Sequence, residues 1–257
     1  MHPRLHLMRG TFVFASLAGA AAQAGGPGPL ALHAPDGFLS LPIAALMWVI
    51  TLGITAYAVK RTNETFDERA IPLMGVTAAF IFAAQMFNFQ VVGGTSGHLL
   101  GGVLAAVLLG PWAGTLVMVA VIAVQGLVFQ DGGLVVMGAN IFNMGIVGTM
   151  GGYAIYRALC GLLGGEQRAR IPAAGIAAWL SVVMGSTAMA IELGISGTTD
   201  LVVALTAMVG IHVLIGIGEA LVTMAALAFV QVTRPDLLGL RDARVAASPA
   251  ASPAVAA

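Results

Sequence analysis

Long apolar runs separated by short polar breaks are the feature that most constrains this sequence. Only 9% of its 257 residues are charged and 59% are hydrophobic, whereas a soluble domain carries about 25% charged residues. Runs of this length predict membrane-spanning helices rather than barrel strands. The 34 glycines agree with this class, because small residues let helices approach closely in lipid. We therefore predict an all-α integral membrane protein.

Several function classes are excluded by composition. The formal net charge is zero and Cys160 is the single cysteine, so nothing indicates nucleic-acid binding, a disulfide framework within the chain or a cysteine-rich metal site. The sequence also has no GxxxxGK[ST] phosphate-binding loop. Any ATP hydrolysis linked to the function is therefore expected from separate chains.

Seven apolar segments are predicted as membrane helices. They are Leu41–Val59, Ile71–Val91, Leu99–Leu109, Trp112–Phe129, Leu134–Ile155, Pro172–Leu193 and Leu201–Val230. The run His98–Phe129 is divided at Gly110-Pro111, because reading it as one helix would place Arg157, Arg168 and Arg170 on the outer side. With seven helices and the N-terminus outside, all nine basic residues after position 31 are cytoplasmic, as the positive-inside rule requires. The C-terminus is then cytoplasmic.

Two terminal segments differ from the membrane domain, residues 32–232. Residues 1–31 carry Arg4 and Arg9 before the short apolar stretch Thr11–Ala24, a pattern typical of a cleaved signal peptide. An uncleaved extension, or a later start at Met8, is the alternative. Residues 233–257 end in a run of Ala, Ser and Pro and are predicted to form a disordered cytoplasmic tail.

Two histidines are predicted to share the outer face. His33 precedes the first helix, and His98 lies in the glycine-rich segment Gly93–Gly102, GGTSGHLLGG. Imidazole is a good ligand for nickel, cobalt, copper and zinc, so the pair is a candidate metal site. Two incidental surface histidines are the competing interpretation.

Four stretches resemble the CbiM/NikM family, the substrate-binding S components of energy-coupling-factor (ECF) transporters for cobalt and nickel. Leu32–Pro42, LHAPDGFLSLP, is similar to the family's amino-terminal MHIPDGFLSP-type segment. Asn88–Gly114, Gln125–Gly145 and Gly210–Thr223 look like its other signature stretches. The resemblance extends roughly from Leu32 to Val230.

The resemblance implies a metal held by four nitrogens. They would be the amine of Leu32, if the chain is cleaved after Ala31, the backbone amide and the imidazole of His33, and the imidazole of His98. A tetragonal nitrogen field suits Ni(II). Copper would fit at least as well by the Irving–Williams order of affinities. The expected cargo is Co(II) or Ni(II), with a slight preference for cobalt, and there is no permanent cofactor. Cleavage after Ala24 would leave no amine nearby, and cleavage before Ala31 would make His33 the third residue and His98 dispensable. The mature N-terminus therefore decides the ligand set.

The resemblance also implies partners and a location. The partners are a transmembrane coupling (T) protein, two ABC ATPase subunits and, as an open question, a small auxiliary membrane subunit. The location is the bacterial inner membrane, where cobalt import supplies cobalamin biosynthesis. Ala79 and Ala83 form a small-xxx-small face on the second helix, a candidate coupling surface because such faces admit another helix.

Other polar residues have a functional and a structural interpretation. Ser96, Asn140 and Asn143 are candidates to orient the histidines, with ordinary helix–helix hydrogen bonding as the alternative. His212 and Glu219 are seven residues apart on one helix face. We expect them to have a structural or gating role, Glu219 lying deep in the membrane and away from the outer site. Asp36 and Asp131 are expected to be turn residues.

Two other functions compete with the ECF subunit. A stand-alone secondary metal permease would use His212 and Glu219 as a proton relay. An intramembrane enzyme would pair Ser96 or Ser186 with His98 or His212, but no recognisable catalytic arrangement supports it, and it ranks last.

Overall fold

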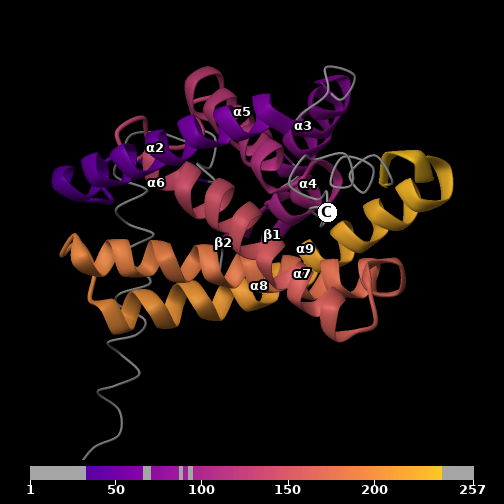
Figure 1. Ribbon diagram of the computed structural model, residues 1–257. Coiled ribbons are helices and arrows are strands. Elements are labelled where there is room, and N and C mark those ends of the chain that lie inside the picture. Colours follow the sequence, from indigo (N-terminus) through magenta and orange to yellow (C-terminus); the bar gives the residue numbers. More distant parts are fainter. Residues whose placement is uncertain (1–32, 66–70, 87–88, 92–94, 239–257) are drawn as a thin grey trace, which may run out of the picture. The chain divides into compact units, whose positions relative to one another are not determined.

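The computed structural model describes residues 33–65, 71–86, 89–91 and 95–238 (Figure 1). The predicted signal peptide, Leu32 and residues 239–257 of the tail lie outside this part of the chain. The side chains of residues 89–91 and 95–97, including that of Ser96, are outside the description as well.

Helices dominate the described residues, which confirms the all-α class. They are α2 (Leu41–Thr65), α3 (Ile71–Met86), α4 (Gly102–Leu109), α5 (Pro111–Val128), α6 (Met137–Asn140), the π-helix η2 (Ile141–Gly151), α7 (Gly152–Leu162), α8 (Glu166–Ile195) and α9 (Leu201–Thr233). The second predicted helix, Ile71–Val91, is too long at its C-terminal end. Here the chain leaves α3 at Met86 and forms a small antiparallel hairpin of β1 (Phe89–Val91) and β2 (Thr95–Gly97).

Four helices of the described chain are long and apolar enough to cross a membrane, namely α2, α5, α8 and α9. The apolar helix α3 is shorter, with 16 residues. Segments α6, η2 and α7 follow one another with helical backbone at both junctions, Asn140 and Gly151. The protein is therefore a helical membrane protein, while seven crossings and the orientation of the termini stay predictions.

Helix α4 lies in the interior and has every one of its 8 residues buried. A helix of this length covers about 12 Å, less than the roughly 30 Å of a hydrocarbon core. It contacts α3, α5, η2, α7, α8 and α9. A Cβ at Gly102 would lie 2.8 Å from the backbone of Gly148 in η2. The absence of a side chain at Gly102 is therefore what allows α4 to approach η2 so closely.

Candidate metal site

The segment His33–Asp36, which we call the strap, is bound along the chain between α5 and η2. Both backbone groups of Ala34 pair with the side-chain amide of Asn140: its N–H donates to Oδ1 at 3.2 Å and its carbonyl accepts from Nδ2 at 3.1 Å. The same carbonyl accepts from the N–H of Gly133 at 2.9 Å. The side chain of Asn140 thus provides hydrogen-bond partners for both backbone groups of Ala34.

Asp36 fixes the other end of the strap. Its carboxylate accepts hydrogen bonds from three successive backbone N–H groups, those of Leu134 (3.2 Å), Val135 (2.8 Å) and Val136 (3.2 Å). A carboxylate is favoured beside the free N–H groups that begin a helical segment. Asp36 is therefore more than the turn residue that the sequence predicted.

Two glycines make room for the strap. Gly132 has φ +101°, and a Cβ there would lie 2.7 Å from Cβ of His33. A Cβ at Gly133 would collide with the backbone nitrogen and the carboxylate of Asp36. Only glycine meets both requirements, because it accepts positive φ and presents no side chain.

His33 is buried, with 4% of its surface exposed. Its backbone N–H donates to Oδ1 of Asp131 at 3.4 Å, and its Nδ1 lies 3.0 Å from the carbonyl oxygen of Asp131. A carbonyl only accepts, so Nδ1 carries the proton and a neutral ring keeps its lone pair on Nε2. That Nε2 is buried without a hydrogen-bond partner among the described residues. It is a donor atom suited to a metal ion.

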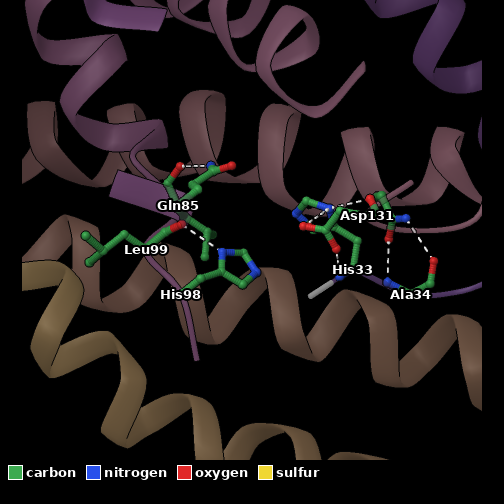
Figure 2. Close-up of polar contacts among 8 residues, drawn as sticks. His33, Ala34, Gln85, His98, Leu99 and Asp131 are labelled. Atoms are coloured by element: carbon green, nitrogen blue, oxygen red, sulfur yellow. Dashed lines mark hydrogen bonds and ion pairs between the residues drawn. The ribbon is translucent and has the colours of Figure 1, made fainter. Parts of the chain in front are cut away.

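His98 lies in the irregular residues that lead into α4, and its ring faces that of His33 (Figure 2). The ring centroids are 5.2 Å apart and the planes make an angle of 88°. Its Nδ1 lies 2.9 Å from the carbonyl oxygen of Leu99, which again leaves the lone pair on Nε2. Burial, and then the neighbouring His33, lower the pKa of His98 to about 4. A neutral, metal-ready imidazole therefore persists at neutral pH.

Side chains of two helices hold the residues that follow His98. Glu219 of α9 accepts from the N–H of Leu100 at 2.7 Å and from the N–H of Gly101 at 2.8 Å. Gln85 of α3 donates from Nε2 to the carbonyl of Leu100 at 2.6 Å. The prediction that Glu219 lies away from the candidate site is therefore wrong, because its carboxylate bonds the residues that follow His98.

The remaining candidates divide between the site and the scaffold. Asn143 donates to Oε2 of Glu192 at 2.9 Å, which is the helix–helix alternative, whereas Asn140 contacts the strap next to His33. His212 bonds the carbonyl of Met208 in its own helix at 2.7 Å. Ala79 and Ala83 both lie exposed on α3.

Sequence reasoning missed the roles of Asp131 and Gln85. Asp131 is predicted as a turn residue, yet its backbone and side chain both bond His33. A glutamine, Gln85, inside the apolar run Ile71–Val91 is the sign available in the sequence, since an amide buried in such a helix requires a partner.

The donor set available to a metal is limited. Among the residues that the structure describes, no group of three or more His, Cys, Asp or Glu side chains is arranged to hold a metal ion. Further donors would have to be backbone or terminal nitrogens. Both atoms of His33 used by the expected chelate, the amide nitrogen and Nδ1, face Asp131 in this structure. Chelation through them would replace these two hydrogen bonds.

The interior helix α4 and the neighbouring rings of buried His33 and half-buried His98 define a helical membrane protein with a candidate cation site. Residues 33–237 match the family described as the cobalt uptake substrate-specific transmembrane region, CbiM. The chain belongs to this family. It is a substrate-specific membrane component of cobalt or nickel transport, and its relatives are transport proteins rather than enzymes.

Individual relatives agree with this assignment. A protein of Archaeoglobus fulgidus with the provisional name of a fused nickel transport protein, NikMN, is 40% identical over 209 residues, 80% of this chain and 68% of that protein. The cobalt transport protein CbiM of Sorangium cellulosum is 32% identical over 217 residues, 80% of this chain and 94% of the relative. A crystal structure of a transition metal transporter has a TM-score of 0.72 and 31% identity, covering 83% of this chain and 99% of that one.

Proposed function

We propose that this protein binds Co(II) or Ni(II) between His33 and His98 and delivers it to an ATP-driven ECF importer. The observation that carries the proposal is that the rings of buried His33 and half-buried His98 lie 5.2 Å apart, brought together by the strap and by the loop before α4. Each ring has its Nδ1 at a backbone carbonyl, so each can present Nε2 as a ligand.

The remaining nitrogens of the proposed site come from the start of the mature chain. If cleavage after Ala31 frees the amine of Leu32, the amine and the amide of His33 add two donors to the two imidazoles. The ring of His33 then binds through Nδ1 in place of Nε2, and its two hydrogen bonds with Asp131 are given up. A four-nitrogen tetragonal field suits Ni(II) and accommodates Co(II). The N-terminal mass of the purified protein tests this, and a mature chain that begins at Gly25 would remove the amine from the site.

The proposed partners are a T protein, two ABC ATPases and a small auxiliary subunit, in a bacterial inner membrane. Support comes from the membership of a family of substrate-specific regions and from the exposed Ala79 and Ala83 on α3. A small exposed face allows a partner helix to approach closely. Co-purification with the T protein, lost in Ala79→Leu, would test this surface.

The main test is metal binding by the purified protein, followed by calorimetry and by the visible absorption of the bound ion. His98→Ala is expected to weaken binding of Co(II) and Ni(II) by more than about 100-fold, because a direct ligand matters at least as much as its supporting residues. His212→Ala is the matched control, since this ring bonds within its own helix. Unchanged binding by His98→Ala would refute the proposed site.

A proton-coupled permease remains the alternative function. Its relay would join His212 to Glu219, but the carboxylate of Glu219 accepts from Leu100 and Gly101, and His212 bonds Met208. Uptake that requires ATPase partners and survives collapse of the proton gradient would favour the ECF function. Uptake by this chain alone would favour the permease.

A further inference from the structure

The peptide group between Leu99 and Leu100 connects His98 to a distant helix. Its carbonyl oxygen lies 2.9 Å from Nδ1 of His98, and its N–H donates to Oε2 of Glu219 at 2.7 Å. A peptide group is planar and rigid. The orientation of the imidazole is therefore tied to the position of a carboxylate in α9 through one stiff unit.

The next peptide group is held from the opposite side. The carbonyl of Leu100 accepts from Nε2 of Gln85 in α3 at 2.6 Å, while the N–H of Gly101 donates to Oε1 of Glu219 at 2.8 Å. Gln85 and Glu219 are fully enclosed, with 0% and 1% exposure. Hydrogen bonds to a buried carboxylate are strong, and losing them leaves a charge without compensation. The two side chains form a clamp on Leu100.

The clamp joins two helices that are separated beside it by a small cavity. The cavity is lined by Phe80 and Ala84 of α3, by Val222 and Thr223 of α9, and by Glu219 itself. Phe80 and Val222 are also exposed at the outer surface of the molecule. Space between the helices permits a small relative movement. Such a movement would act directly on the peptide groups next to His98.

We propose that Glu219 is a positioning residue, which with Gln85 holds the Leu99–Gly101 backbone so that movement of α3 relative to α9 turns His98 toward or away from the metal. The inference rests on the proposed metal site. It assigns to α9 a part in retaining the ion, and to α3, which carries the exposed Ala79 and Ala83, a part in releasing it when a partner binds.

The first test is Glu219→Gln. A glutamine amide has one acceptor oxygen and one donor group, so one of the two N–H groups loses its partner. We expect the bound ion to dissociate at least about tenfold faster, the lower end of effects for residues that orient a metal ligand. Release into excess chelator, followed by stopped-flow absorption, measures the rate. The visible band of bound Ni(II) should also shift, because the angle of the His98 ring changes.

Gln85→Leu tests the clamp from α3. It removes the donor to Leu100 and should accelerate release in the same direction by a smaller factor, because Glu219 still holds two N–H groups. Thr223→Val is the matched control, since Thr223 lines the same cavity whereas Gln85 and Glu219 hold the loop. We expect its dissociation rate and absorption band to equal those of the wild type.

A purely structural role for Glu219 would have a different result. The melting temperature without metal would fall in Glu219→Gln, while the metal-induced rise in melting temperature, the dissociation rate and the absorption band would stay as in the wild type. That pattern would overturn the inference and leave the proposed function intact. Wild-type protein that bound neither Co(II) nor Ni(II) would overturn the proposed function and this inference with it.

Discussion

The two histidines of the site are held by different parts of the molecule. His33 is fixed by its neighbours along one continuous segment, Asp131–Asn140, through Asp131 itself, Gly133 and Asn140. His98 is fixed through Leu100 by side chains of two separate helices, α3 and α9. The first arrangement moves as one body with its ligand, whereas the second changes when the helices shift. One half of the proposed site is thus held by a single segment, and the other half by two helices.

The largest effect on metal affinity is expected in the strap, which carries His33. Gly133→Ala places a Cβ against the backbone and carboxylate of Asp36, so the strap must leave its place. We expect loss of metal affinity by more than about 100-fold, exceeding the usual effect of a single supporting residue. Calorimetric titration with Ni(II) measures it. Gly53→Ala in α2 is the control, because nothing lies within 4 Å of its Cβ; equal affinities for the two variants would contradict the role of the strap.

The half of the site that contains His98 should make the free energy of unfolding depend on pH. The folded pKa of His98 is lowered to about 4 from its usual 6.5, so at intermediate pH the unfolded chain binds a proton that the folded chain does not. The stabilisation is complete above pH 6.5 and is lost as the pH falls toward 4. We expect a loss of about 2 kcal/mol in the free energy of unfolding.

Denaturation in detergent at pH 7 and pH 4.5 measures this loss. Other groups titrate over the same interval, so the comparison is with His98→Gln, which has no group to protonate at this position. The variant should lose less stability than the wild type between the two pH values. An identical loss would show that His98 titrates normally.

Substitutions of two neighbouring asparagines, Asn140 and Asn143, should differ in their effect on metal affinity, and both effects should be smaller than that of Gly133→Ala. Asn140→Ala removes both hydrogen bonds to Ala34 and should weaken metal binding about tenfold, since a net hydrogen bond is worth about 1 kcal/mol. Asn143→Ala instead leaves Glu192 of α8 without this donor. We expect it to lower the melting temperature while metal affinity stays near that of the wild type. Equal losses of affinity would mean that α8 also positions the strap.

The smallest effect on metal binding is expected on the outside of α3. Ala83→Leu adds bulk to an exposed position and should leave Ni(II) affinity within about twofold, as for most surface substitutions. Transport by the assembled complex should fall, because the partner helix can no longer approach closely. Normal transport would remove Ala83 from the proposed coupling surface.

Composition was sufficient for the helical membrane class, because only apolar runs of this length tolerate lipid. Charge distribution placed His33 and His98 on the same predicted side, and the structure brings their rings together. What sequence could not show was depth. Counting along α9 placed Glu219 far from the loop of His98, but the N–H of Leu100, two residues after His98, donates to it. The role of Asp131 could not be predicted from the sequence either, because its partner, His33, lies 98 positions away.

The interior position of α4 has a consequence for biogenesis. With 8 residues, this helix is too short to be recognised alone as a membrane segment during synthesis. Most of its packing partners, α5, η2, α7, α8 and α9, follow it in the chain, and Glu219 at its beginning belongs to the last of them. The loop with His98 therefore reaches its final position only after translation of α9. An incomplete chain would then lack the proposed metal site until the transporter is finished.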